Sequence, residues 1–406
     1  MRYRLVEIEL SAPLAPIILD PHEVGIGLIA RLHDRLIGFR MFRLPPGTTL
    51  DVAALSAMAD GAFAQAVIES GVRDEIADPQ RAQTPLASLT IAICTKDRAQ
   101  RLARLLSSLV GPCAQSPFAR TEILVIDNAP SDDATRKAVE GFPGVRHVVE
   151  PKAGLNFARN AALANATGDL LAFLDDDVVI DRYWLDGLAA ARRGAPDAGG
   201  FTGLVLPFRL DTEAQILFES RGGFGRGFQR REWRGTSFDY ALHPAGAGLL
   251  GAGCNMAFDV ALLRSIGGFD DALDTGAPLP GGGDLDIFYR VIRAGRVMVY
   301  EPRYIVFHEH RETIAQLRRQ YWTWGLGMMA FLVKAMRTDP QIRDRQRAMM
   351  RWWVYDQIRT MFRTGIRLRI RDFRFAVAEF VGGVQGMLGE YDRSQRRIDA
   401  IRQAHR

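Results

Sequence analysis

Between residues 89 and 177, short apolar runs alternate with helical patterns, and this alternation restricts the possible folds more than any other feature. Residues 89–94, 123–126 and 170–174 are almost continuously apolar, and leucines at helical spacing follow the first run. Strands that are apolar throughout are typical of a parallel sheet covered by helices on both faces. We therefore expect an α/β fold with a mostly parallel, Rossmann-like sheet, in which ligands bind at the strand ends.

Two flanking segments depart from this pattern. Before the alternation begins, residues 25–44 predict a two-stranded hairpin and residues 50–69 a helix, which together make a small α+β unit. Residues 80–85 predict a linker, and the last part of the chain is helical and rich in arginine. The expected division is an accessory N-terminal unit over 1–85, an α/β domain over 86–310 and a C-terminal extension over 311–406.

The C-terminal extension is strongly basic, with 20 basic and 9 acidic residues in a chain whose net charge is only +5. The preceding part is therefore mildly acidic, and we expect no nucleic-acid partner. Arginines and apolar residues form parallel rows at helical spacing: Arg351, Arg359, Arg363, Arg367 and Arg371 beside Val354, Ile358, Phe362, Ile366 and Ile370. These rows predict a basic amphipathic helix. It either contacts an anionic membrane surface or packs on the preceding domain with its arginine edge in solvent.

The sequence predicts a cytoplasmic protein, either free or peripherally bound at the inner face of the cell membrane. Its three cysteines, Cys94, Cys113 and Cys254, match neither a paired disulfide framework nor a metal-binding knuckle. Acidic residues interrupt the N-terminal apolar stretch, so we expect no signal peptide. We find no run of about 18 uncharged apolar residues, so we also expect no spanning helix.

Carboxylates follow two of the apolar runs. Asp175, Asp176 and Asp177 stand directly after the run over 170–174. Because adjacent carboxylates repel one another, such a cluster suits Mg²⁺ or Mn²⁺ shared with substrate phosphates, and the alternative is a solvated acidic turn. Asp127 ends the second run in the same way and predicts a contact to a base or ribose, with a simple turn as the alternative.

Three further segments each allow two interpretations. The sequence TKDR after the first run lacks the G-x-G-x-x-G pattern, which argues against a dehydrogenase. The glycine-rich residues 222–227 resemble such a pattern but follow no strand, so we expect a flexible loop there. Residues 154–160 predict a helix start, where Arg159 and Asn160 either bind phosphate or belong to a capped surface helix.

Seven segments, in this order, resemble the family 2 glycosyltransferases: LTIAICTKDR, ILVIDN, GLNFARN, FLDDDV, GAGCNMAF, IGGFD and GGGDLDIFYRVIRAG. Each segment is weak alone, but seven in the right order over residues 88–327 are specific. The resemblance implies a single GT-A domain that acts on nucleotide sugars. It also implies that Asp175 and Asp177 are the outer carboxylates of a D-x-D signature, which binds the ribose and the metal–diphosphate group.

The resemblance further implies roles for individual residues. The nucleotide-sugar donor would contact Thr95, Asp97, Arg98, Asp127, Arg159, Asn160, Asp175, Asp176, Gly253 and Asn255. Mg²⁺ or Mn²⁺ would be bound by Asp177, Asp175 and His308, although His308 can also be a strand-end histidine with no metal. Asp284 would be the catalytic base. Because Gly283 replaces a glutamate common in the family, Asp286 remains a second candidate, and both acids can instead be favourable helix-start charges.

These expectations together describe a metal-dependent inverting glycosyltransferase. Its donor would be a UDP or dTDP sugar, with hexosyl or deoxyhexosyl transfer to a glycan or a lipid-linked acceptor in cell-envelope polysaccharide biosynthesis. Two alternatives remain open. A sugar-phosphate nucleotidyltransferase also needs acids and a metal, but it normally carries a glycine-rich loop where this chain has TKDR. A non-catalytic module that binds nucleotide sugars or membranes is the other alternative.

Overall fold

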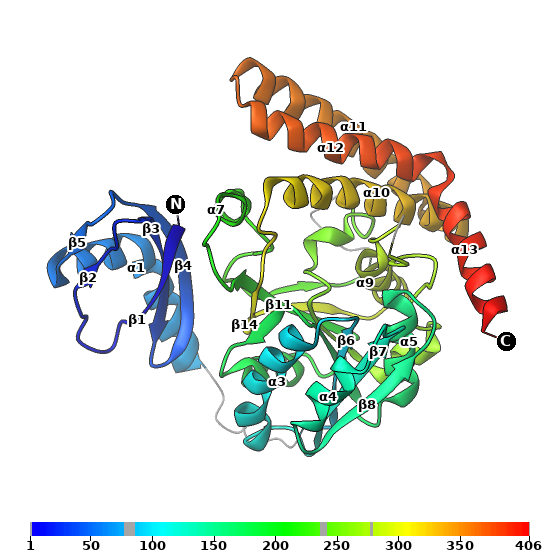
Figure 1. The fold of residues 1–406 in the computed structure, drawn as a ribbon, viewed down its shortest axis with the longest axis horizontal. Helices are drawn as coiled ribbons and strands as arrows, with labels where there is room; N and C mark the ends of the chain where they lie inside the picture. Colours follow the sequence, from blue (N-terminus) through cyan, green and yellow to red (C-terminus); the bar gives the residue numbers. More distant parts are fainter. Residues whose placement is uncertain (1, 77–85, 236–241, 277–278, 406) are drawn as a thin grey trace.

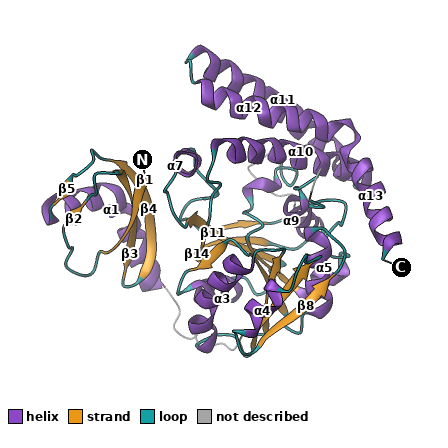
Figure 2. Ribbon diagram, in the orientation of Figure 1, coloured by secondary structure: helices purple, strands orange, loops and turns teal. Residues whose placement is uncertain are grey.

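The computed structural model describes residues 2–76, 86–235, 242–276 and 279–405, and the predicted linker over 80–85 lies outside them. A nine-stranded sheet occupies the centre (Figures 1 and 2). Its strands are β6 (Leu89–Thr95), β7 (Thr121–Asn128), β8 (Val145–Glu150), β9 (Leu170–Asp175), β10 (Val178–Ile180), β11 (Gly200–Pro207), β12 (Arg231–Trp233), β13 (Asn255–Asp259) and β14 (Met298–His308). The strand order is β10-β14-β11-β13-β9-β6-β7-β8, and β12 pairs with β14.

Most strands of this sheet run in one direction. β8, β7, β6 and β9 are parallel neighbours, and β11 and β14 are parallel to each other. The strand β13 is antiparallel to both β9 and β11, so it reverses direction between two sets that point the same way. The predicted α/β fold with a mostly parallel sheet is therefore confirmed.

Helices cover both faces of the sheet. They are α3 (Ala99–Ala114), α4 (Ala134–Glu140), α5 (Leu155–Asn165), α6 (Trp184–Gly194), α7 (Glu213–Ser220), α8 (Val260–Ser265) and α9 (Gly283–Arg293). Alternate residues of β6 belong to different cores, as a strand's period of two requires. Ile91 and Ile93 pack in the core that contains α3 and α6, whereas Ala92 packs in the core that contains α5 and α9. This burial explains why the strands are apolar on both faces.

The N-terminal part forms a separate small sheet. Its elements are β1 (Arg2–Glu9), β2 (Ile17–Ile18), β3 (Glu23–Leu32), β4 (Arg35–Arg43), β5 (Thr49–Leu50) and α1 (Val52–Ile76). The predicted hairpin is present as β3–β4, and its turn residues His33 and Asp34 both have positive φ, as a tight two-residue turn requires. No pattern in the sequence indicated that β1 pairs with β3 in parallel.

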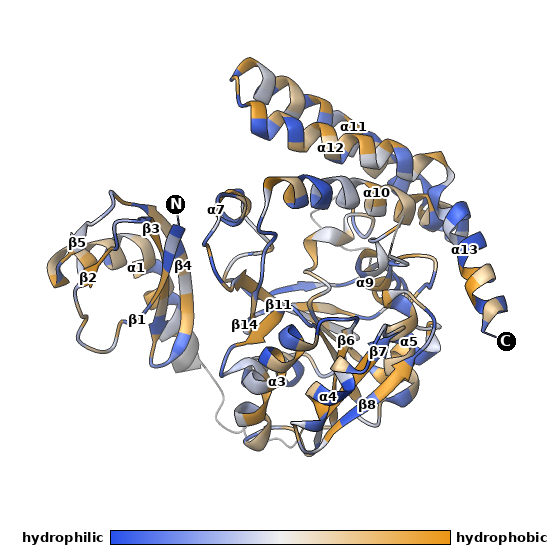
Figure 3. Cartoon of the chain, viewed as in Figure 1, coloured by the Kyte–Doolittle hydropathy of each residue, from blue (hydrophilic) through white to orange (hydrophobic). Residues whose placement is uncertain are grey.

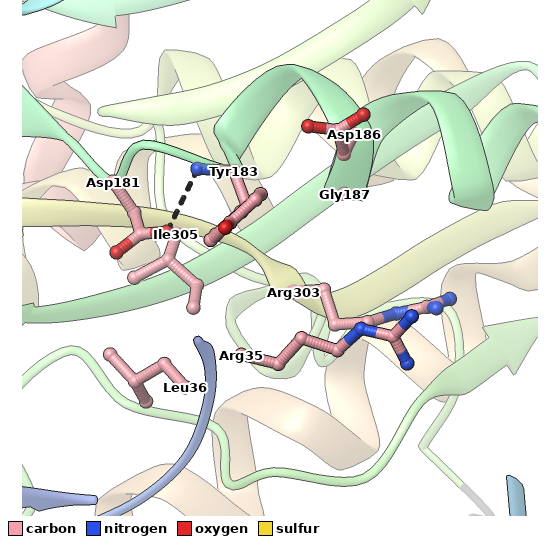
Figure 4. A pocket seen from close by; sticks show the side chains of 8 residues that line it. All are labelled: Arg35, Leu36, Asp181, Tyr183, Asp186, Gly187, Arg303 and Ile305. Atoms are coloured by element: carbon pink, nitrogen blue, oxygen red, sulfur yellow. Dashed lines mark hydrogen bonds between the residues drawn. The ribbon is translucent and has the colours of Figure 1, made fainter. Parts of the chain in front are cut away.

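The small sheet packs against the central one. Arg31 of β3 forms a buried ion pair with Asp181, and Leu36 of β4 packs in one apolar cluster with Ile305 of β14. Figure 4 shows the cavity beside this contact, where Leu36 lies opposite Ile305 and the side chain of Arg35 runs alongside Arg303. This cavity lies away from the polar strand ends, so it belongs to the contact between the sheets.

Helix α1 bears on the expectation of no spanning helix. By length and composition alone, Val52–Val72 is apolar enough to cross a membrane, with a mean hydropathy of 1.2. The stretch contains Asp60 and Glu69, which is why a search for uncharged runs misses it. Leu55, Ala59 and Phe63 of α1 are buried in the core of the small sheet. That packing accounts for part of its apolar character without a membrane.

The C-terminal part is helical, as predicted. It consists of α10 (Ile314–Thr338), α11 (Arg343–Ile366), α12 (Ile370–Gln385) and α13 (Tyr391–Ala404), with short turns between them. Helix α10 lies over the central sheet, and α11 and α12 form a hairpin on its outer side (Figure 1). A side chain at Gly325 or Gly382 would clash with the backbone of the opposite helix, so α10 and α12 touch backbone to backbone.

Candidate active site

The carboxyl ends of three neighbouring parallel strands place polar residues at one edge of the sheet. The register pairs Thr95 of β6 with Asp127 of β7, and Cys94 of β6 with Asp175 of β9. The strand β14 ends at His308, which pairs with Val178, the residue after the acidic triplet. The predicted donor and metal residues at the ends of these four strands therefore lie along one edge of the sheet.

The middle acid of the triplet, Asp176, is held by the chain itself. Thr95 Oγ1 donates a hydrogen bond to Asp176 Oδ2 at 2.7 Å, and Arg98 Nη1 donates one to Oδ1 at 2.9 Å. Asp176 is buried, and burial raises its pKa although the charge of Arg98 opposes this. Both carboxylate oxygens are thus occupied, which fixes the loop that carries Asp175 and Asp177.

Asp177 and His308 form the pair best suited to a metal ion. Oδ1 of Asp177 is buried without a hydrogen-bond partner in the described residues, and it lies 3.3 Å from Nε2 of His308. Burial lowers the pKa of His308 to about 4, so the imidazole is neutral and its nitrogen can act as a ligand. Across the described ranges, no group of three or more potential protein ligands is preassembled. The pair therefore fits a site that a substrate completes.

A chain of polar contacts on the Nδ1 side of the ring orients His308. Nδ1 of His308 lies 3.3 Å from Nδ1 of His310, and Nε2 of His310 lies 2.9 Å from Oε2 of Glu219 on α7. The ring of Phe224 packs against His308, with 5.0 Å between the ring centroids. Because these contacts engage the other ring nitrogen, Nε2 of His308 is directed toward Asp177. This arrangement favours His308 over His310 as the residue that faces a metal.

Arg159 is a buried cation among the acids of the site. Its guanidinium donates hydrogen bonds to Asn156 and to Asp274, both near 3 Å. Burial acts to lower the pKa of Arg159, but Asp274 and Asp175 more than offset this and raise it. Burial, followed by repulsion from Asp177, raises the pKa of Asp175 to about 7, although Arg159 opposes this. Arg159 thus helps to hold several carboxylates at one place.

The two candidate bases on α9 have different surroundings. Asp284 is partly exposed at the helix start, and a Cβ placed on Gly253 would lie 3.1 Å from its Cβ, so these two residues are neighbours. Asp286 is almost fully buried and forms ion pairs with Arg290 at 2.8 Å and Lys334 at 2.6 Å. The structure therefore leaves the carboxylate of Asp284 accessible and places that of Asp286 between two cations.

Two of the predicted donor residues lie on neighbouring loops. Asp127 is buried next to His147 at 3.2 Å, and its Oδ1 has no hydrogen-bond partner in the described part of the chain. Asp97 is exposed, has a positive φ of 53°, and accepts a hydrogen bond from the backbone of Ser131. Asp97 therefore ties the loop after β6 to the loop after β7, on the side where Asp127 lies.

Two other predicted donor residues use their side chains inside the protein. Asn160 of α5 binds the backbone of Phe269 through both ends of its amide. Asn255 is fully buried at the start of β13, where its amide group donates to the backbone of Tyr304 and its oxygen accepts from Trp184 Nε1 at 3.0 Å. These contacts connect elements of the scaffold and leave neither side chain directed at a ligand.

The structure also brings in residues that the sequence did not indicate. Glu219 and Phe224 reach the two histidines, and the glycine-rich segment around Phe224 is packed, where a flexible loop was expected. Arg226 of the same segment is largely buried and donates hydrogen bonds to the carbonyl of Gly248. Asp274 pairs with Arg159. These residues come from distant parts of the chain, so a local motif could not reveal them.

Comparisons with known proteins identify the family of the chain. Residues 90–232 match the family model described as "Glycosyl transferase family 2". The chain is 30% identical over 252 residues to the succinoglycan biosynthesis protein ExoM of Rhizobium meliloti, covering 58% of this chain and 72% of that protein. It is 26% identical over 231 residues to the pre-mycofactocin glycosyltransferase of Mycobacterium tuberculosis, covering 55% of this chain but only 43% of that protein.

Solved structures with a similar chain path include two glycosyltransferases. The mannosyltransferase PcManGT from Pyrobaculum calidifontis, in complex with GDP-Man and Mn²⁺, has a TM-score of 0.48 and 15% identity, over 82% of this chain and 98% of that one. GalNAc-T7 with UDP, GalNAc and Mn²⁺ has a TM-score of 0.39 and 16% identity, over 63% of this chain and 51% of that one. From the match to ExoM, the family model and the α/β architecture, the chain belongs to glycosyl transferase family 2 and is a glycosyltransferase.

Proposed function

We propose that this glycosyltransferase moves a sugar from a nucleoside-diphosphate sugar to an acceptor hydroxyl, with Mg²⁺ or Mn²⁺ and with inversion at the anomeric carbon. The observation that carries the proposal is the buried, unbonded Oδ1 of Asp177, 3.3 Å from the neutral imidazole of His308. A buried carboxylate oxygen without a partner is costly, so it needs a ligand in the working enzyme.

Asp177 and His308 would hold the metal ion, and Asp175 stands beside them. When bound, the metal supplies positive charge to the departing diphosphate. Asp175 loses its proton most readily when such a cation is near, because its pKa is held at about 7 by burial and by Asp177. Arg98 adds a fixed cation, since its guanidinium lies 2.9 Å from Asp176 and 3.8 Å from Asp177.

The donor nucleotide would lie along the ends of β6 and β7. Asp127, with one unbonded oxygen, can accept hydrogen bonds from a base, while Asp97 and Thr95 shape the adjoining loop. A carboxylate that accepts from a base N–H suits the uracil or thymine of UDP or dTDP sugars. We propose a hexosyl or deoxyhexosyl unit as the transferred group.

Asp284 would act as the base. It is the carboxylate on α9 that stays partly exposed, and it lies against Gly253, where a Cβ would come within 3.1 Å of the Asp284 Cβ, so only glycine fits there without a shift. An acceptor hydroxyl is a weak nucleophile until a positioned carboxylate takes its proton. In-line attack from the side of Asp284, opposite the departing diphosphate, inverts the anomeric configuration.

The acceptor we propose is a growing glycan or a lipid-linked glycan in polysaccharide biosynthesis of the cell envelope. ExoM, by its name, takes part in succinoglycan biosynthesis, which supports a polysaccharide acceptor. The apolar residues exposed on the C-terminal hairpin support a peripheral position at the inner face of the membrane, where a lipid-linked acceptor would be found.

A donor-hydrolysis assay with Mn²⁺ tests the proposal against its alternatives. Release of UDP or dTDP from a nucleotide sugar, abolished by a chelator, is the expected result. Release of pyrophosphate would instead indicate a sugar-phosphate nucleotidyltransferase. Binding of donors without turnover in the presence of candidate acceptors would indicate a non-catalytic module. A thermal-shift screen of donors with and without Mn²⁺ identifies the sugar to use.

A further inference from the structure

The outer face of helix α11 carries a row of large apolar side chains that nothing in the described chain covers. Phe362 and Ile366 are 67% and 66% exposed, and Tyr355 is 63% exposed. Trp352 and Ile358 continue the same row and are about half exposed. At 100° per residue, these five side chains fall within roughly 120° of arc on one side of the helix. Such a row is unusual for a surface helix, whose apolar side normally faces the core.

Arginines stand within and beside this apolar row. Arg351 and Arg359 fall inside the same arc, and Arg363 borders it. Among the described residues, none of these three arginines forms an ion pair, although ion pairs are common elsewhere in the C-terminal part. Residues 351–374 contain seven arginines and two aspartates. The face therefore combines uncovered apolar groups with unpaired positive charge.

The tip of the hairpin also combines exposed apolar side chains with arginines. Leu368 is 82% exposed and Ile370 is 61% exposed, and both alternate with arginines. Figure 3 shows hydrophobic and hydrophilic residues side by side along α11 and α12, which project beyond α10. The buried side of α11 is different, since Trp353 stacks on Phe380 of α12 and holds the helix in place. The exposed row is thus presented on a supported helix.

We propose that the outer face of the α11–α12 hairpin docks on an anionic lipid bilayer. Charge complementarity selects this occupant: a headgroup layer supplies phosphates at the level of the arginine guanidinium groups, while the apolar row enters the acyl boundary beneath. Arginine stems can lie along the apolar surface with their charged ends in the headgroups. A second copy of the chain docked by a twofold axis would instead place arginine rows against each other.

A path of ring contacts connects the buried side of α12 with the proposed metal site. Phe224 packs on His308, and Trp324 of α10 lies 5.9 Å from Phe224 and 5.2 Å from Tyr321, centroid to centroid. Tyr321 in turn stacks on Phe375 of α12 at 5.0 Å. An open pocket between α7 and α10 lies along this path and is lined by Phe218, Arg221, Gly223, Tyr321 and Trp324.

Docking by the hairpin would hold the enzyme at the bilayer surface, with α10 between the hairpin and the central sheet. This part of the inference rests on the proposed function, because it implies that the acceptor is carried by a lipid. The docking itself does not depend on the chemistry of the site, so the two can fail separately.

Co-sedimentation of the full-length protein with phosphatidylcholine vesicles, with and without phosphatidylglycerol, tests the docking. We expect binding to the anionic vesicles at low salt, and its loss near 1 M salt, where the screening length falls to about 3 Å. Because each basic residue near an anionic surface contributes about a fivefold factor, R359Q/R363Q should lower the partition coefficient at least tenfold. F362S/I366S should lower binding to a similar degree.

Matched variants elsewhere serve as controls. R40Q/R43Q removes two exposed arginines from the small sheet, and I68S/V72S removes two exposed apolar residues from α1. Both should bind vesicles as the parent does. Thermal unfolding verifies that each variant is folded, and donor hydrolysis without vesicles should be unchanged in all four.

Several outcomes would overturn the proposal. One is a parent protein that stays in the supernatant with anionic vesicles at low salt. Equal loss of binding in the I68S/V72S control would assign the contact to α1. If light scattering shows that the parent is a dimer and F362S/I366S a monomer, the face is an interface between copies. A failure of donor hydrolysis with vesicle binding intact would instead count against the proposed function alone.

Discussion

Lys334 of α10 places its ammonium 2.6 Å from the buried carboxylate of Asp286 on α9. The same ammonium lies 3.1 Å from Asp270, so one cation joins two acids and ties α10 to the catalytic domain. Asp284, two residues before Asp286, has no such partner among the described residues. Neighbouring aspartates in one motif thus have different surroundings, which the sequence alone did not indicate.

We expect D284N and D286N to fail in different ways. D284N should lower donor turnover to acceptor by about 100-fold or more, since the proton acceptor is lost, with little change in stability. D286N should lower the free energy of unfolding by about 3 kcal/mol, because Lys334 and Arg290 lose a buried partner. Chemical unfolding and initial rates measured on the same preparations separate the two. A stable but inactive D286N together with an active D284N would reverse the assignment of the base.

The metal site predicts a loss of Mn²⁺ affinity in D177N and H308A. Each variant should bind Mn²⁺ in the presence of UDP at least about tenfold more weakly. A loss of this size is typical even when the mutated residue only hydrogen-bonds a metal ligand. Titration calorimetry measures this directly, and H22A, at an exposed histidine far from the strand ends, is the control. Parent-like Mn²⁺ affinity in both variants would place the ion elsewhere.

Glu379 on α12 predicts a pH dependence of stability. Burial raises the pKa of Glu379 to about 7 from the usual 4.5, although a hydrogen bond from Gln357 opposes this. The folded state therefore holds this proton more tightly, so its contribution to stability is complete below pH 4.5 and is lost as the pH rises through 7. At pH 8, E379Q should be more stable than the parent by about 2–3 kcal/mol. Denaturant unfolding from pH 5 to 8 measures this, and parallel curves for parent and variant would contradict it.

We expect substitution of Asn255 to lower the stability of the protein without abolishing donor hydrolysis. Its fully buried amide satisfies the carbonyl of Tyr304 and the indole N–H of Trp184, so N255L should cost about 2–4 kcal/mol. N165L, at the partly exposed end of α5, should cost much less. Donor hydrolysis per folded molecule should persist in N255L at low temperature. If N255L were as stable as the parent but did not bind the donor, Asn255 would instead be a residue of the sugar pocket.

The sequence predicted the parts of the fold that depend on local patterns. The central strands are apolar on both faces because helices cover both, and the carboxylates near the ends of β7 and β9 meet at one edge of the sheet, as the sequence predicted. The N-terminal hairpin was also predictable from its two strands and turn. The division of the chain into three units, and the roles of individual site residues, stay predictions.

The rest depends on contacts between distant segments. Two examples are the parallel pairing of β1 with β3 and the contact of Glu219 with His310. Both follow from how the elements pack, and neither produces a periodic pattern in the sequence. Likewise, Asn160 and Asn255 lie in motif segments, yet the fold turns both side chains toward backbone groups. A motif specifies which residues are near the site, and packing decides which of them point into it.

The glycine contacts between α10 and α12 have a mechanical consequence. No layer of side chains separates the two backbones at Gly325 and Gly382. Side-chain rearrangement therefore cannot absorb a shift of α12 relative to α10 at these positions. A displacement of the hairpin is therefore expected to move α10 as well, and the ion pair between Lys334 and Asp286 joins α10 to α9.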